Sequence, residues 1–220
     1  MSARWMTCAV AVLTACSSAA HTPTPAAPTP QSMPVVQGHA AGIAKAKADS
    51  ARLPYDAADI HFMSGMISHH AQAIAMAKWV PTHGASAATG RLAERIVNAQ
   101  QDEIGIMQQW LADRLQPVPE PDPAGMKMKM DGMEHVQLMP GMLSESQMKQ
   151  LDQARGQEFD RLFLIFMIQH HRGAVAMVKE LFGTTGAGQD QTVFKFASDD
   201  NVDQSTEIAR MEKMLEALIP

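Results

Sequence analysis

The sequence predicts an all-α protein, a four-helix bundle built from two repeated helical pairs. A stretch of twenty residues occurs twice, at 59–78 and 160–179, and the two copies align without a gap. Apolar residues recur in both copies at the spacing of one helix face. A second shared pattern, Gln-x-x-Glu-Ile-x-x-Met, begins at Gln100 and again at Gln204. One helical pair cannot bury its apolar face alone, so we expect two pairs to close a bundle within residues 54–220.

The N-terminus indicates export. A short apolar run follows Arg4 and is too short to span a bilayer as a mature helix. It ends in Leu-Thr-Ala-Cys at 13–16, which resembles the bacterial lipobox. We therefore expect residues 1–16 to be a signal peptide and Cys16 to carry a lipid anchor to the membrane. Ordinary cleavage near Ala15 or Ala20 is the alternative, which would make the protein secreted.

Residues 17–53 are expected to be a flexible tether. The segment is rich in Ala, Thr and Pro and has little apolar surface to bury. A short helix could form at 40–52. With the anchor at Cys16, this segment would hold the domain outside the cytoplasmic membrane or in the cell envelope.

Composition narrows the functional classes. The net charge of the 220-residue chain is −5 and no basic run occurs, which argues against nucleic-acid binding. Eighteen residues are Met, whose thioether suits soft metal ions. The only cysteines are Cys8 and Cys16, so a mature chain acylated at Cys16 has no disulfide and no free thiol.

Capping and breaking residues predict the helix limits. Repeat one is placed at 55–116, with Asp56 as the N-cap of the first helix and Pro81 with Gly84 ending it. A second helix is expected at about 87–115, before a run of prolines. Repeat two is placed at 144–219, with helices at about 157–182 and 192–218.

The segment between the repeats is predicted to be a linker. Residues 117–143 are rich in Met and show no clear periodicity, so no strand is predicted there. Ser144 and Gln147 resemble a capping box for a short helix that ends near Arg155. Gly156 is expected to break that helix.

The repeated helices combine histidine with methionine. Met66 precedes His69 and His70 by three and four residues, and Met167 precedes His170 and His171 in the same way. These spacings make the side chains neighbours on a helix surface, where a thioether and an imidazole can share a metal ion. On a helical wheel His70 and His171 point nearest the bundle axis, whereas His69 and His170 lie to the side.

Two carboxylates qualify the metal hypothesis. Glu103 and Glu207 lie on the apolar faces of the second helices. They could hold the imidazole N–H groups in a purely structural or interaction module, orient metal-bound histidines, or ligate the metal themselves.

Two aspartates are expected to have structural roles. Asp59 and Asp160 precede the inner histidines by eleven residues, about 16 Å along a helix. We expect them to provide helix N-terminal charge or to pair with Arg91, Arg95 or Arg161.

An enzyme is not favoured. The Glu-x-x-His pairs of di-iron bundles do not occur in the sequence, and neither does a Gly-rich phosphate loop. A metal-dependent oxidoreductase is kept as a further alternative. Such an enzyme would require an open coordination position on a bound redox metal.

Two further features are the Met-rich linker and an apolar face on the helix of the second repeat. The linker offers soft donors that are either incidental or a flexible arm capturing Cu(I) or Ag(I), namely Met126, Met128, Met130, Met133, His135, Met139 and Met142. Opposite His171, an apolar face formed by Leu162, Ile165 and Phe166 requires cover. That cover could come from residues 40–52, from the linker or from a second subunit in a homo-oligomer.

The repeated pattern Phe-x-x-x-Met-Ile-x-His-His-x-x-Ala-Ile/Val-x-Met, with the downstream Gln-x-x-Glu-Ile-x-x-Met, resembles the bacterial family called domain of unknown function 305. The resemblance covers about residues 55–218 and includes Met139-Pro-Gly-Met142 and Phe159-Asp-Arg-Leu-Phe163. It implies a ferritin-like four-helix bundle and, from some members, copper binding and copper tolerance. The implied metal ligands are Met66, His69, His70, Met76, Met167, His170, His171 and Met177. We therefore predict an exported protein that binds copper, as Cu(I) in preference, and does not catalyse a reaction.

Overall fold

The computed structural model describes residues 42–44, 55–130 and 132–218. The predicted signal peptide, Cys16 and the tether lie outside these residues, apart from 42–44, which are helical. The described chain is mostly helical, which confirms the all-α class, with one small two-stranded sheet in addition.

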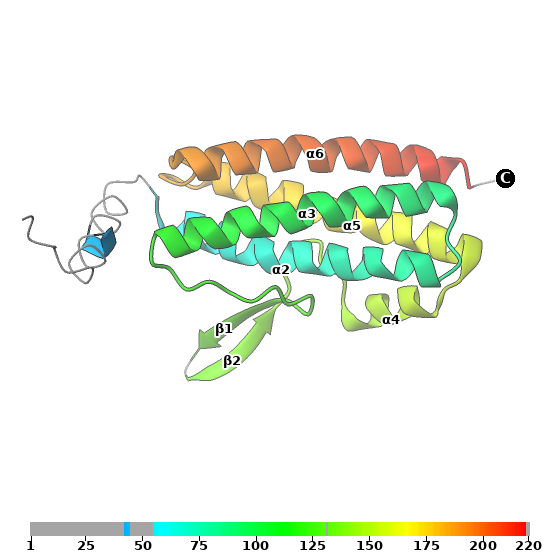
Figure 1. Cartoon of the computed structure of the whole chain (residues 1–220), viewed down its shortest axis with the longest axis horizontal. Helices are drawn as coiled ribbons and strands as arrows, with labels where there is room; N and C mark the ends of the chain where they lie inside the picture. Colours follow the sequence, from blue (N-terminus) through cyan, green and yellow to red (C-terminus); the bar gives the residue numbers. More distant parts are fainter. Residues whose placement is uncertain (1–41, 45–54, 131, 219–220) are drawn as a thin grey trace, which may run out of the picture.

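Four long helices run side by side (Figure 1). They are α2 (Ala57–Trp79), α3 (Ala87–Asp113), α5 (Gly156–Gly183) and α6 (Gln191–Glu216). Helix α2 packs against α3 and α5 packs against α6, and the two pairs meet along α2 and α5. A 3-10 turn, η1 (Val80–Thr82), follows α2, and the short helix α4 (Glu145–Gln153) precedes α5.

The residues predicted to start α2 and α4 cap these helices in the structure. The Asp56 carboxylate accepts hydrogen bonds from the backbone N–H groups of Ala58 and Asp59, and the Asp59 carboxylate accepts one from the Asp56 N–H. Ser144 and Gln147 form the expected capping box at α4. Gly156 separates α4 from α5, as predicted, and is itself the first residue of α5, with φ of +58°. Such a φ is accessible to glycine at little cost.

The core consists of two hydrophobic clusters, one toward each end of the helices. One combines Phe62 of α2 with Leu181 of α5, and the other combines Ala77 of α2 with Phe163 of α5. The start of α2 therefore packs with the end of α5, because the two helices run in opposite directions (Figure 1). The middle of both helices lies between the clusters.

The two repeated aspartates each secure a loop of the opposite pair. Asp59 on α2 accepts a hydrogen bond of 2.7 Å from the N–H of Gly188, in the loop before α6. Asp160 on α5 accepts bonds of 3.1 and 3.2 Å from the N–H of Ser86, the N-cap of α3. Their role is structural, but their described partners are backbone amides and not the predicted arginines; Arg161 pairs with Glu158.

The prediction of a strand-free linker is wrong. Residues Met126–Met130 (β1) and Met133–Gln137 (β2) form an antiparallel hairpin that projects from the helices (Figure 1). The signal was present in the sequence, since Met-Lys-Met-Lys-Met alternates with the period of a strand. It is followed by Asp131-Gly132, a dipeptide favoured in two-residue hairpin turns. The high Met content obscured this alternation.

The apolar face of α5 is covered by the chain itself. Leu162 and Phe166 are buried and Ile165 is partly buried, in the same cluster as Leu143 and Leu151 of the α4 region. Helix α4 packs directly against α5. Leu143 is the last residue of the predicted linker, so the linker supplies part of the cover, whereas α4 was not among the predicted alternatives. Most of residues 40–52 lie outside the described chain, and cover by a second subunit stays a prediction. The short helix after the capping box supplies the missing apolar surface.

Within the described ranges, no helix combines the length and the apolar character needed to cross a lipid bilayer.

Candidate metal centre

Four imidazoles form a buried layer at the middle of the helices. His69 and His70 come from α2, His170 and His171 come from α5, and all four are 0 % exposed. The rings of His69 and His170 lie with centroids 3.8 Å apart, across the contact between the two helices. The layer therefore separates the two hydrophobic clusters of the core.

The predicted positions of the histidines fit the structure. His69 and His170, expected at the side, form the central pair between α2 and α5. His70 and His171, expected nearest the axis, reach carboxylates of α3 and α6. The helical wheel did not predict that the two side histidines contact each other, because that contact depends on how α2 packs against α5.

Burial keeps the central imidazoles neutral. Burial, with a smaller contribution from the neighbouring His70, lowers the pKa of His69 to about 3. Burial likewise holds the pKa of His170 well below its usual range, with His69 and His171 adding to the effect. Both rings are therefore uncharged near neutral pH. A neutral imidazole keeps a nitrogen lone pair that can bind a metal ion without first losing a proton.

Hydrogen bonds orient two of the rings. His69 Nε2 lies 3.0 Å from the carbonyl oxygen of Pro140, which can only accept, so Nε2 carries the proton and Nδ1 carries the lone pair. His171 Nε2 lies 2.8 Å from Glu207 Oε2 and donates to it, which again leaves Nδ1 with the lone pair. Donation of the second ring N–H to a carbonyl or carboxylate is the usual arrangement of metal-binding histidines.

Unpaired polar atoms are concentrated in this layer. Buried side-chain atoms without a hydrogen-bond partner include Nδ1 of all four histidines, Nε2 of His70 and His170, Oε1 of Gln100 and Gln204, and Asp200 Oδ2. The backbone of His69 acts to raise the pKa of His170, but neither ring nitrogen of His170 forms a hydrogen bond of good geometry. Buried polar groups are nearly always paired in native proteins. Such a concentration of unpaired donors and acceptors fits a site that takes a ligand.

The loop between the hairpin and α4 closes one side of the layer. Its Pro140 carbonyl oxygen would lie only 1.9 Å from a Cβ at position 173, so α5 requires Gly173 there. The equivalent residue of the first copy is Gln72, which donates to the carbonyl of Leu143 in the same loop. Met139 and Met142 of this loop are buried, and the Met139 N–H points at the sulfur of Met142. Sequence reasoning assigned these two methionines to a flexible arm and missed this packing.

The predicted methionine ligands are buried on both sides of the layer. Met66 and Met177 belong to one hydrophobic cluster, and Met76 and Met167 belong to the other. Each cluster thus contains one methionine from α2 and one from α5. The four predicted histidines meet in one layer, and the four predicted methionines are buried in the clusters on its two sides.

Each predicted glutamate meets the second histidine of its own helical pair. Glu103 Oε2 lies 2.8 Å from His70 Nε2, and Glu207 Oε2 lies 2.8 Å from His171 Nε2. The two contacts differ in geometry, since the His171–Glu207 contact is a hydrogen bond and the His70–Glu103 contact is not. Both carboxylates are partly exposed, at 19 % and 15 % of the side chain, so they connect the buried layer to the surface.

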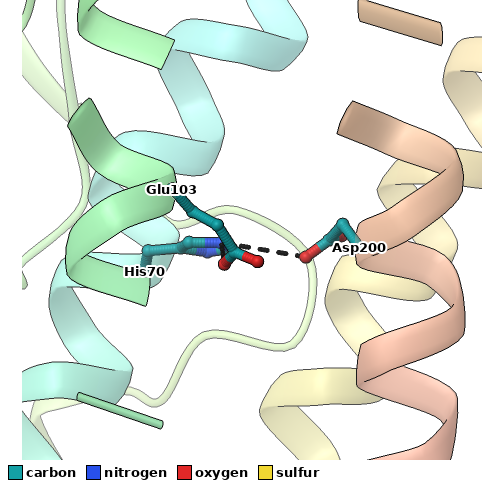
Figure 2. Close-up of side chains that lie close together, drawn as sticks. All are labelled: His70, Glu103 and Asp200. Atoms are coloured by element: carbon teal, nitrogen blue, oxygen red, sulfur yellow. Dashed lines mark ion pairs between the residues drawn. The ribbon is translucent and has the colours of Figure 1, made fainter. Parts of the chain in front are cut away.

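Asp200 is the residue that sequence reasoning missed. It reaches from α6 toward His70 of the other pair, with Oδ1 at 3.7 Å from His70 Nε2 (Figure 2). Nitrogen and oxygen donors of His70, Glu103 and Asp200 lie within 4.8 Å of one another, and in the described part of the chain no other such group of His, Cys, Asp or Glu is found. The position equivalent to Asp200 in the first copy is Ile96, and that difference was visible in the sequence.

The Met-rich hairpin presents its donors on one face. Met126 pairs across the strands with Gln137, and Met128 pairs with His135. Since alternate residues of a strand share a face, Met126, Met128, Met133 and His135 lie on the same side. Met126 is buried against the helices, whereas Met133 and His135 are exposed toward the tip. Met130 ends β1 opposite Met133.

The family follows from comparison with known proteins. The family model described as domain of unknown function DUF305 matches residues 59–215. The chain belongs to the DUF305 family. No curated protein matches it.

Solved structures of DUF305 proteins share the fold. A Streptomyces coelicolor DUF305 protein described as secreted is 28 % identical, with a TM-score of 0.61 over 73 % of this chain and 93 % of that chain. A DUF305 fragment from Deinococcus radiodurans is 27 % identical, with a TM-score of 0.61 over 74 % and 99 %. CopM in its Cu(I)-bound form is 27 % identical, with a TM-score of 0.55 over 74 % and 98 %. CopM has also been solved with Cu(II) and with Ag.

Proposed function

We propose that this DUF305 protein is an exported copper-binding protein that holds Cu(I) with histidine and methionine. It would buffer copper or confer copper tolerance outside the cytoplasm without catalysing a reaction. The observation that carries the proposal is the buried layer of four imidazoles whose Nδ1 atoms have no hydrogen-bond partner.

The chemistry of the donors favours a soft metal. Met66, Met76, Met167 and Met177 are buried in the two hydrophobic clusters on either side of the layer, and thioether ligands select Cu(I). Neutral imidazoles add donors that carry no charge, so binding a monovalent cation leaves one positive charge to be balanced. Glu207, bonded to His171, can balance it through the imidazole. The CopM structures with Cu(I), Cu(II) and Ag support the same class of ligand.

We also propose a ferritin-like fold and a location outside the cytoplasm. We interpret the four long helices as a ferritin-like bundle that arose by duplication of one helical pair, because equivalent residues make equivalent His–Glu contacts. Export is supported by the secreted relative from Streptomyces coelicolor. Anchoring through Cys16 remains a prediction from the sequence.

The hairpin supplies a candidate route for the metal. Its soft-donor face leads from exposed Met133 and His135 through Met128 to buried Met126. Such a gradient of exposure suits capture of Cu(I) at the tip and transfer toward the bundle. Met139 and Met142 lie beyond it, in the loop that contacts His69 through Pro140.

Two other functions make different predictions. A structural or interaction module would use the His–Glu contacts only as buried pairs, and copper would then leave the melting temperature unchanged. A metal-dependent oxidoreductase would turn over a substrate with a redox metal bound. Copper binding without turnover favours the proposed function over both.

The test is a Cu(I) titration of the full chain against a competing chelator. Exchange of Met66 and Met167 for Leu removes two thioethers while conserving side-chain volume, so the fold should be retained. We expect Cu(I) affinity to fall by at least about tenfold, as for loss of a metal-site contact. Met63→Leu is the matched control, since Met63 is buried on α2 but is not a predicted ligand. Equal Cu(I) binding by all three proteins would refute the proposal.

A further inference from the structure

The two His–Glu contacts of the layer have different surroundings. The repeated Gln-x-x-Glu pattern makes Glu103 equivalent to Glu207, and the same register makes Ile96 of α3 equivalent to Asp200 of α6. Ile96 is fully buried in a hydrophobic cluster. Asp200 is equally buried, at 1 % exposure, but places a carboxylate next to His70 and Glu103. One copy therefore has an aliphatic side chain where the other has an acid.

A buried carboxylate at this position is costly without a compensating charge. Burial raises the pKa of Asp200 to about 6, and Glu103 also raises it, while His70 acts in the opposite direction. Two carboxylates thus share one imidazole, and no lysine or arginine among the described residues is paired with either of them. A divalent cation would neutralise both carboxylates.

The donor geometry fits a small divalent cation. Ligand atoms about 2.0–2.2 Å from Zn²⁺ in a tetrahedral arrangement are separated from one another by roughly 3–4 Å. His70 Nε2 lies 2.8 Å from Glu103 Oε2, slightly below that range, and 3.7 Å from Asp200 Oδ1, within it. The contact between His70 Nε2 and Glu103 Oε2 lacks hydrogen-bond geometry. The two atoms are therefore close together without sharing a proton in an ordinary hydrogen bond. Figure 2 shows the three side chains converging from α2, α3 and α6.

The surrounding groups support ligation. Gln204 donates a hydrogen bond of 3.1 Å to Asp200 Oδ1, which orients the carboxylate in the way that neighbours of metal ligands do. The other oxygen, Oδ2, is buried and has no partner. Glu103 is partly exposed, so a cation can reach the group from the surface between α3 and α6.

We propose that His70, Glu103 and Asp200 form a site for a divalent cation of the zinc class, separate in chemistry from the Cu(I) donors and present in one copy of the repeat only. The nitrogen and oxygen donors suit Zn(II) or Cu(II), whereas the thioethers suit Cu(I). The proposal does not rest on Cu(I) binding, with which it shares only His70. The second copy, with Ile96 in place of the acid, has no equivalent site.

The experiment is a calorimetric titration of the metal-free full chain with Zn(II). Wild type is expected to bind one Zn(II) at this group. Asp200→Asn and Glu103→Gln each remove one anionic ligand at nearly constant size and should weaken that binding by at least about 100-fold, the upper end of the effect of a neighbouring group. Glu207→Gln is the matched control, because it alters the equivalent His–Glu contact, and should retain wild-type Zn(II) affinity.

The two proposals fail in different ways. Asp200→Asn should bind Cu(I) as wild type does, and the Met66→Leu and Met167→Leu exchange should bind Zn(II) as wild type does. Wild-type Zn(II) affinity in Asp200→Asn, or an equal loss in Glu207→Gln, would overturn the zinc-class site. If Asp200→Asn does not fold, Asp200→Ile, which carries the residue of the other copy, serves in its place.

Discussion

The two copies of the repeat place a histidine and a glutamate 2.8 Å apart in the same way, yet their surroundings differ in charge. At His171 the glutamate accepts an ordinary hydrogen bond, and the position equivalent to Asp200 in the other copy is occupied by buried, aliphatic Ile96. At His70 the neighbour is Asp200. In the proposed duplication, two equivalent His–Glu contacts would differ by one substitution, and that substitution would direct one of them to the proposed zinc-class cation.

The central pair, His69 and His170, differs from both His–Glu contacts. His69 and His170 contact each other and not a carboxylate, and burial lowers the pKa of each. The layer therefore contains a neutral centre between two carboxylate-bearing flanks. In the two proposals, the neutral centre would suit a soft metal ion and the carboxylate-bearing flank at His70 a harder one.

The largest expected effect is acid sensitivity of the central pair. The folded-state pKa of His69, about 3, lies below the ordinary value of 6.5, so the unfolded chain binds the proton more readily. Stability from the neutral ring is complete above pH 6.5 and is lost as the pH falls toward 3, by about 5 kcal/mol in total. His69→Gln should remove this part of the loss, measured as the free energy of urea unfolding between pH 7 and pH 4.

The control for acid sensitivity is His61→Gln, an exposed residue of the same helix. Its acid profile should match wild type. A wild-type profile in His69→Gln would show that the central ring is not the acid-sensitive group.

The next effect comes from exchanging the neighbours of the two His–Glu contacts. Ile96→Asp introduces a carboxylate into a hydrophobic cluster and should lower the free energy of unfolding by about 3–5 kcal/mol in the absence of metal. Zn(II) should recover part of this loss if the acid completes a second site. Asp200→Ile, the reverse exchange, should not destabilise the protein. Denaturant unfolding with and without Zn(II) measures both, and an Ile96→Asp protein as stable as wild type would contradict the comparison.

The smallest effect on stability is expected at the hairpin. Met133→Leu with His135→Ala changes exposed side chains, so the free energy of unfolding should stay within about 0.5 kcal/mol of wild type. Transfer of Cu(I) from a competing chelator should become slower. Val136→Ala alters the opposite face of β2 and should transfer Cu(I) at the wild-type rate. Equal rates for both variants would remove the hairpin from the route.

The sequence by itself determined the helices, their capping residues and the grouping of histidine with methionine. These features are local, since they depend on spacings of three or four residues and on side chains that bond to their own helix ends. Asp56, Ser144 and the two His-His pairs could be found in this way. The hairpin was also encoded locally, in Met-Lys alternation before Asp131-Gly132, but was not recognised.

Only the tertiary structure decided which histidines meet and which acid joins them. The contact of His69 with His170 depends on how α2 crosses α5, and the approach of Asp200 to His70 joins residues 130 positions apart on different helical pairs. The cover of Leu162 and Phe166 by α4 and the Pro140 bond to His69 are contacts of the same kind. Such contacts follow from packing between helices, which no periodicity within a single helix contains.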